Sequence, residues 1–242
     1  MVRSILASSV VACICISLSA PVLAAGPTIT VKATPPLAGP APANTNSNEK
    51  LRAAAEPFEK VTEISFKATL AAIDQTIGEA ETAARGVRTL LPLDAAGRLD
   101  AQIGAMKAAR QKQDHAGLAL ASIEAYRVLV SAVADSAKVP PEGSLLDYAG
   151  FRYDADLKAS PIRWRDMTKA VSFARETWAK PSPRAKSFPE TARFKKTIAD
   201  MDKAVAQEEV SSAALSVKAE LDLARKIHHV PLPAVSSLPR AA

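Results

Sequence analysis

Apolar residues recur at alternating steps of three and four along most of this chain, the spacing that places them on one face of an α-helix. The longest run extends from residue 66 to residue 87. No segment shows the sustained alternation of β-branched residues that predicts strands. We therefore expect an all-α fold, in which amphipathic helices bury these stripes against one another. The first stripe consists of Phe66, Leu70, Ile73, Ile77, Ala80, Ala84 and Val87.

The same spacing predicts a helical bundle of about seven helices. Proline marks several helix ends, because it cannot continue a helix from within. Pro161 is instead suited to the first turn of a helix, where a missing N–H costs nothing. The third helix is apolar on every side, which predicts a central position. The expected ranges are about 57–87, 94–111, 114–137, 143–158, 161–179, 188–206 and 209–229.

A repeat pattern with an offset of 95 residues runs through these helices. We interpret it as two duplicated three-helix units, joined by the 143–158 helix as a connector and packed face to face around one core. The alternative is coincidence, because alanine-rich helices share their spacing by chance. The aligned residues are Arg98, Leu99, Ile103, Met106 and Ala109 with Arg193, Phe194, Ile198, Met201 and Ala204.

Residues 1–24 have the layout of a cleaved signal peptide. Arg3 supplies a positive start, an uncharged apolar stretch covers residues 4–20, and the small and apolar residues up to Ala24 fit a cleavage site. We expect cleavage after Ala24 and a periplasmic or secreted protein. Two alternatives stay open: lipidation at Cys13, and an uncleaved N-terminal anchor.

The two cysteines, Cys13 and Cys15, both lie in this signal segment. The mature chain is therefore expected to be cysteine-free and to depend on a packed core for stability. Residues 25–50 are rich in Pro and Asn, which predicts a disordered tether. The helical bundle domain is expected at 51–230, followed by a disordered tail at 231–242. No transmembrane span is expected after signal cleavage.

Positive charge is concentrated in residues 158–196, which hold eleven Lys and Arg against three Asp and Glu. We expect a basic surface there, with Arg163, Arg165 and Lys169 as candidate residues. Such a surface suits an acidic protein, an anionic lipid or an anionic envelope polymer. Nucleic acid is not an expected partner of an exported protein. The alternative interpretation is an ordinary solvated face.

Residues 145–154 combine two tyrosines, a phenylalanine, two acids and an arginine in a chain that is poor in aromatic residues. Residues 124–127 of the third predicted helix have a similar make-up. If the helices that contain these two segments face each other, their polar side chains form a ligand site within the bundle. The alternative is a buried hydrogen-bond and ion-pair network that fixes helix register. The candidate residues are Glu124, Arg127, Asp147, Tyr148 and Arg152.

Candidate metal or haem ligands are few. Met106 and Met201 occupy matching stripe positions, and His228 closes the last stripe. Two facing methionines can ligate a soft metal or a haem iron, whereas core packing is the alternative. The chain contains no C-x-x-C-H, H-E-x-x-H or G-x-S-x-G motif, so no cofactor is favoured and nothing supports an enzyme.

These observations predict an exported, non-enzymatic helical-bundle protein that binds or interacts with a partner in a bacterial-type cell envelope. The alternative is a periplasmic metal- or haem-binding bundle. The metal content and visible spectrum of the purified protein distinguish the two functions.

Overall fold

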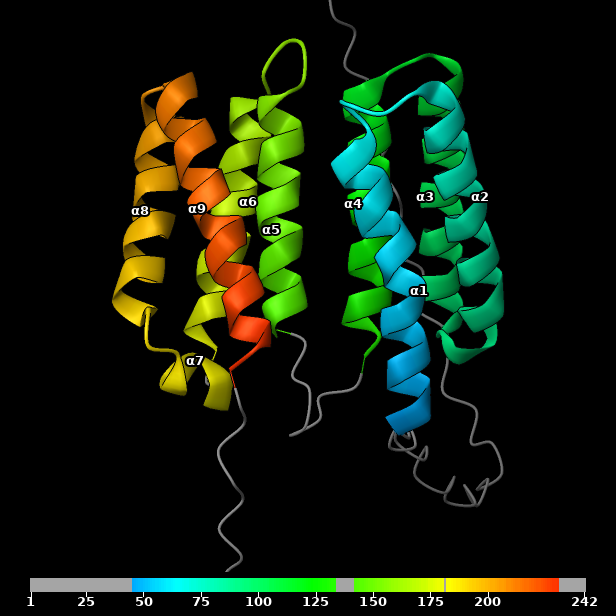
Figure 1. Ribbon diagram of the computed structural model, residues 1–242, viewed down its shortest axis with the longest axis horizontal. Helices are drawn as coiled ribbons and strands as arrows, with labels where there is room; N and C mark the ends of the chain where they lie inside the picture. Colours follow the sequence, from blue (N-terminus) through cyan, green and yellow to red (C-terminus); the bar gives the residue numbers. More distant parts are fainter. Residues whose placement is uncertain (1–44, 134–141, 181, 231–242) are drawn as a thin grey trace, which may run out of the picture. The chain divides into compact units, whose positions relative to one another are not determined.

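Helices make up all the regular secondary structure that the computed structural model describes, over residues 45–133, 142–180 and 182–230 (Figure 1). These ranges contain nine α-helices, one 3-10 turn (Arg88–Leu90) and no strand, which confirms the all-α prediction. Within them, none of the helices is long and apolar enough to cross a membrane. The α-helices are α1 (Thr45–Ile64), α2 (Leu70–Val87), α3 (Leu93–Gln111), α4 (His115–Ser131), α5 (Glu142–Leu157), α6 (Trp164–Ala179), α7 (Pro183–Ser187), α8 (Thr191–Ala206) and α9 (Val210–His228).

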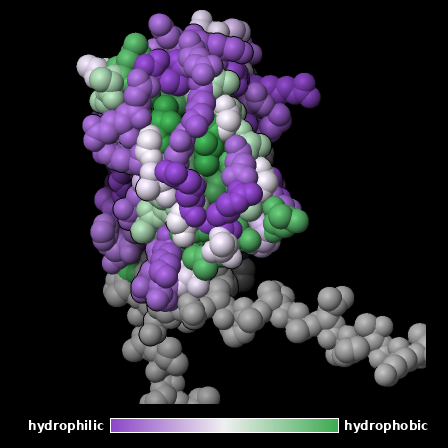
Figure 2. All heavy atoms as spheres, turned by 90° about the vertical axis from the view of Figure 1, so that its right-hand side faces the viewer, coloured by the Kyte–Doolittle hydropathy of each residue, from purple (hydrophilic) through white to green (hydrophobic). Residues whose placement is uncertain are grey.

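Helices α1 to α4 pack around one apolar cluster, with α1 against α2 and α4, and α3 against α4. The stripes predicted for these helices supply part of it, because the 3–4 spacing turns them to a common side, and α1 adds buried residues that precede the first stripe. The outward face of α2 and α3 is mainly hydrophilic, with narrow apolar strips between the helices (Figure 2). The largest completely buried side chains of this cluster are Phe58, Ile73, Leu99, Met106, Leu118, Ile123 and Leu129.

A second apolar cluster lies among α5, α6, α8 and α9. Here α5 packs against α6 and α9, and α8 packs against α9 and α6. The observed cores are therefore two clusters, not the single core predicted for two face-to-face units. The largest completely buried side chains are Leu146, Tyr153, Met167, Phe194 and Met201.

Helix α5, which corresponds to the connector predicted for residues 143–158, is deeply packed in the structure. Twelve of its sixteen residues are buried, and it packs against α4 as well as α6 and α9. Its apolar side chains point in two directions: Tyr148 and Phe151 join the first cluster, while Leu146 and Tyr153 join the second. The two clusters therefore meet at α5.

Two glycines allow α9 to lie close to α5. A Cβ atom at Gly143 would stand 2.8 Å from the His228 ring. A Cβ atom at Gly150 would overlap the carboxylate of Glu220. Since seven residues separate these glycines, they lie on one face of α5 and leave room for α9 along its length.

The first predicted helix, 57–87, is wrong, because the structure contains two helices there. Helix α1 ends at Ile64, where the Ser65 hydroxyl donates to the Val61 carbonyl at 2.6 Å. Helix α2 begins after Thr69, whose side chain accepts a hydrogen bond from the Ala72 N–H at 3.3 Å. A threonine N-cap of this kind starts a helix. The apolar spacing continues across the break, so spacing alone does not locate it.

Other boundaries also differ from the prediction. Helix α1 begins at Thr45, inside the 25–50 segment expected to be a tether. Helix α6 begins at Trp164, so Pro161 precedes the helix instead of occupying its first turn. The short helix α7 was not predicted. Helix α4 ends at Ser131, with Ala132 as its C-cap, so it is shorter than the predicted 114–137 helix. The signal peptide, residues 25–44 of the tether and the tail lie outside the described residues.

We expect Phe58→Ala to destabilise the protein by about 3–5 kcal/mol, because it opens a cavity in the first cluster. Phe58 is completely buried, at 0 % exposure. Urea unfolding followed by far-ultraviolet circular dichroism measures the free energy of unfolding. Leu93→Ala is the matched control, since Leu93 is 88 % exposed. Equal effects of the two changes would contradict this placement of the core.

Candidate functional site

Four of the five residues predicted for a polar site come together where α4 and α5 meet. The Tyr148 hydroxyl donates to Glu124 Oε1 at 2.8 Å, and Arg152 forms an ion pair with the same oxygen. Arg127 pairs with the other oxygen, Oε2, at 2.9 Å. The Arg127 guanidinium also lies 5.2 Å from the centre of the Tyr148 ring. We call these four residues the α4–α5 network.

The α4–α5 network links the two helices through paired groups, although the buried Arg152 Nε has no hydrogen-bond partner among the described residues. Each of its charges has an opposite charge within the network, and burial raises the pKa of Tyr148 to about 12. Asp156 is next to the α4–α5 network, since its Oδ2 atom lies 3.8 Å from Arg152 Nε. Burial raises the pKa of Asp156 to about 6, against the lowering effect of Arg152. This arrangement favours the register-fixing alternative over a ligand site.

Asp147, the fifth predicted residue, lies apart from the α4–α5 network. Its Oδ2 atom is 2.6 Å from His228 Nε2 on α9. Successive residues of a helix point about 100° apart, which separates Asp147 from Tyr148. Asp147 instead lines a cavity of about 380 Å³ among α1, α4, α5 and α9, which we call the interhelix cavity.

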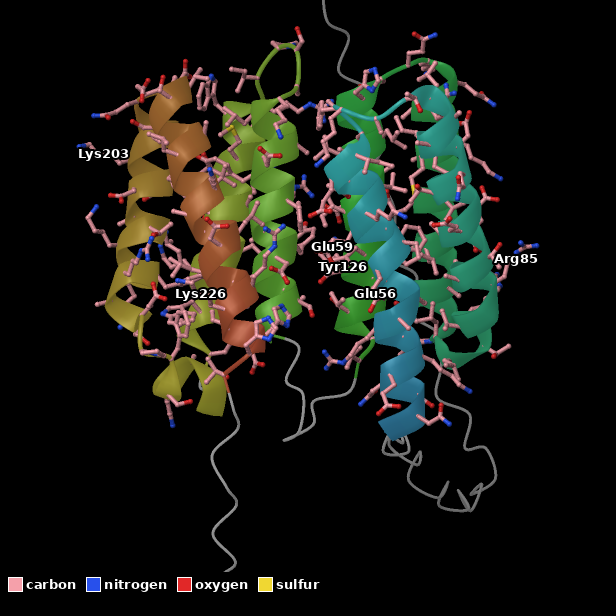
Figure 3. All side chains as sticks on the ribbon, in the orientation of Figure 1. Glu56, Glu59, Arg85, Tyr126, Lys203 and Lys226 are labelled. Atoms are coloured by element: carbon pink, nitrogen blue, oxygen red, sulfur yellow. The ribbon has the colours of Figure 1, made fainter. Side chains whose placement is uncertain are left out.

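Glu59 is another carboxylate that lines the interhelix cavity. Burial raises its pKa to about 7, and the charges of Asp147 and Glu63 act in the same direction. Glu56 and Glu59 lie on the flank of α1, with Tyr126 of α4 close to Glu59 (Figure 3). Sequence reasoning missed Glu59, which follows the buried Phe58 in α1.

Glu220 is a further buried carboxylate that sequence reasoning missed. It is completely buried, at 0 % exposure, and neither of its oxygens has a hydrogen-bond partner among the described residues. Burial and the nearby Asp147 raise its pKa well above the ordinary value. A signal was present, because Glu220 stands four residues after Ser216 and four before Ala224, both on the buried face of α9.

A cavity of about 960 Å³ lies among α6, α7 and α8. We call it the α6–α8 cavity. Four of its lining residues are basic and one, Asp202, is acidic. Arg175 pairs with Asp202 at 3.0 Å, which leaves three lysines on the lining. Its lining consists of Arg175, Trp178, Ala179, Lys180, Ser182, Ala185, Lys186, Phe188, Thr191, Lys195, Ile198, Ala199 and Asp202.

An aromatic wall closes one side of the α6–α8 cavity. The half-buried Trp178 ring lies 4.4 Å from the Phe194 ring and 6.2 Å from the Phe188 ring, centre to centre. Phe188 is held in the turn before α8, because its carbonyl accepts a hydrogen bond from the Thr191 hydroxyl at 2.7 Å. The Ser182 side chain caps α7 by accepting from the Ala185 N–H at 3.4 Å. Short capped elements therefore position this wall.

The three candidate residues of the basic surface lie elsewhere on the same segment. Arg163, Arg165 and Lys169 are exposed at the beginning of α6, and Lys169 pairs with Asp166 at 2.7 Å. None of the three lines the α6–α8 cavity. The basic residues that do line it come later in the predicted segment 158–196.

The candidate metal ligands are separated in the structure. Met106 is completely buried in the first cluster and Met201 in the second, so the two methionines do not share a site. His228 is engaged by Asp147. In the part of the chain that the structure describes, no three His, Cys, Asp or Glu side chains are grouped to hold a metal ion.

Comparison of the chain with protein-family models, curated proteins and solved structures finds no match. The functional inference therefore depends on the geometry of the two cavities and the α4–α5 network.

We expect Glu124→Ala to lower the free energy of unfolding by about 2 kcal/mol, because it leaves a partly buried arginine and a buried hydroxyl without their acceptor. Urea unfolding at neutral pH measures the change. Asp94→Asn is the control, since it removes an exposed ion pair with Arg98 that contributes little. A loss no greater than that of the control would show that the α4–α5 network does not hold the two helices.

We expect Glu59→Gln to stabilise the protein at pH values above about 7 and to have little effect near pH 4.5. The folded-state pKa is about 7, above the ordinary 4.5. The contribution of Glu59 to stability is therefore fully present below pH 4.5, the ordinary pKa. It is lost as the pH rises through about 7, the folded-state pKa. Urea unfolding across this pH range should show a flatter pH dependence for the variant. Parallel curves would contradict the shifted pKa.

Proposed function

We propose that this protein is an exported, non-enzymatic binding protein whose α6–α8 cavity takes an anionic ligand with an apolar part. The observation that carries the proposal is the combination of lysines and aromatic rings around one large cavity. Among the partners expected from the sequence, an anionic lipid or a similar amphiphile fits this site best.

The positive charge of the residues that line the α6–α8 cavity favours a ligand with a negative charge. Lys180, Lys186 and Lys195 line it, and none of them forms an ion pair with a described acidic residue. Exposed ammonium groups without partners favour a phosphate, sulfate or carboxylate group, with which they form charge-assisted hydrogen bonds. Asp202 does not oppose this, because Arg175 neutralises it.

The shape and lining of the cavity favour a small molecule over a flat protein surface. Its volume of about 960 Å³ lies at the upper end of the usual range for ligand pockets. Trp178, Phe188 and Ile198 supply apolar area for an acyl chain or ring. Apolar burial provides most of the affinity of such sites, while the polar groups orient the ligand.

We also infer that the chain arose by duplication of a four-helix unit, α1–α4, with α5, α6, α8 and α9 as the second copy. The offset of 95 residues extends to α1 and α5, where three aligned pairs of residues are buried in the two clusters. These positions are Leu51, Ala54 and Phe58 in α1 with Leu146, Ala149 and Tyr153 in α5. At this offset α7 corresponds to the 3-10 turn Arg88–Leu90 of the first copy. The cavity wall is built from the second copy, which fits a binding role acquired by one copy.

We expect the purified protein to bind octyl phosphate, and Lys186→Glu combined with Lys195→Glu to weaken this binding at least tenfold, equivalent to about 1.4 kcal/mol. Quenching of tryptophan fluorescence and titration calorimetry measure the dissociation constant. Reversing two charges replaces attraction of the phosphate by repulsion.

Lys203→Glu is the matched control, because Lys203 is exposed on α8 and lies outside the cavity lining (Figure 3). Octanol and octyl trimethylammonium test the contribution of charge. Three outcomes would overturn the proposal: no saturable binding of octyl phosphate, equal binding of octanol, or equal weakening by the control variant.

A further inference from the structure

Asp147 presents an unsatisfied carboxylate oxygen in the interhelix cavity. Its side chain is largely buried, and the residue is only 5 % exposed. Oδ2 is engaged by His228, whereas Oδ1 has no hydrogen-bond partner among the described residues. Because a buried acceptor without a donor is costly, native structures rarely retain one without a reason. Asp147 also lines the cavity, and its buried Oδ1 belongs to the same carboxylate.

The arginines of the interhelix cavity already have interaction partners, whereas the carboxylates are only partly paired with basic residues of the described chain. Arg225 is paired with Glu63 at 3.0 Å, and Arg52 has an interaction partner. Glu59 lines the same cavity from α1, and no ion pair with a described basic residue engages it. Glu59 therefore has no ion-pair partner among the described residues, and Asp147 uses only one of its two carboxylate oxygens.

The walls between these carboxylates are apolar or aromatic. Ala55 of α1, Val130 and Tyr126 of α4 line the cavity, and all three are buried residues. A molecule that suits both features carries cationic N–H donors at its ends and a short hydrocarbon chain between them. A bare metal ion is less suited, since no group of three ligating side chains is arranged for one in the described residues.

We propose that the interhelix cavity binds a short organic diamine, one of whose ammonium groups donates to the Asp147 carboxylate and the other to Glu59. Each ammonium supplies the opposite charge and the hydrogen bonds that a buried carboxylate requires. The methylene chain lies against Ala55 and Val130. This site is separate from the α6–α8 cavity and does not depend on the function proposed for it.

Binding of an ammonium group also predicts release of protons near neutral pH. The pKa of Glu59 is about 7 in the free protein, so part of the population carries a proton that an ammonium displaces. Release should fade well above pH 7, where Glu59 is already ionised. The other charged and titratable groups facing Glu59 or lining the cavity are Arg52, Glu56 and Glu63 of α1, Tyr126 of α4, Asp147 of α5, Arg225 and His228 of α9, and His229 just after α9.

Titration calorimetry with putrescine, the four-carbon diamine, tests the proposal on the intact protein. We expect saturable binding and, near pH 7, a heat that depends on the ionisation enthalpy of the buffer because protons are released. Glu59→Gln and Asp147→Asn should each weaken binding at least tenfold and Glu59→Gln should abolish the proton release. Circular dichroism checks that both variants are folded. If Asp147→Asn does not fold, putrescine binding by Glu59→Gln alone decides the outcome.

Glu49→Gln is the matched control, because Glu49 is exposed on the same helix and does not line the cavity. The combined Lys186 and Lys195 charge reversals should leave putrescine binding unchanged, which separates this site from the α6–α8 cavity. The proposal is overturned if putrescine does not bind, if uncharged butanediol binds equally well, or if Glu59→Gln weakens binding no more than Glu49→Gln does.

Discussion

Helix α5 is buried on both faces, and the arrangement of the other helices depends on this constraint. Tyr148 and Phe151 enter the first cluster while Leu146 and Tyr153 enter the second. A helix with two apolar faces has to be covered on both sides. The α4–α5 network then fixes its register on one side, and the close approach of α9 past Gly143 and Gly150 fixes it on the other. Both cavities are formed by helices that pack, directly or through one neighbour, on α5.

The helical architecture could be predicted from apolar spacing, because that spacing directly records which face of each helix is buried. Most predicted ranges agree with the structure within a few residues at each end. The break between α1 and α2 was missed because the stripe keeps its period across Ser65 and Thr69, and only side-chain capping ends one helix and starts the next. The role of α5 was missed because a helix with two buried faces has no single stripe.

The candidate sites were less predictable, since they depend on which helices meet. Glu124, Arg127, Tyr148 and Arg152 could be grouped from composition alone, because α4 and α5 do face each other. Glu59 and Glu220 could not be assigned to a site in this way. A single acidic residue among apolar ones does not indicate which neighbouring helix it packs against. The α6–α8 cavity required α7, a five-residue helix too short to leave a periodic pattern.

The two faces of α5 also determine how the molecule comes apart. The sixteen-residue helix α5 contributes residues to both apolar clusters. If either cluster unfolds, a large apolar surface of α5 is exposed, although the other cluster needs α5 in place. Two packed halves that share a structural element lose their independence, so that the described helices melt as one cooperative unit instead of one half after the other. A chain with two cores would then have a single unfolding transition.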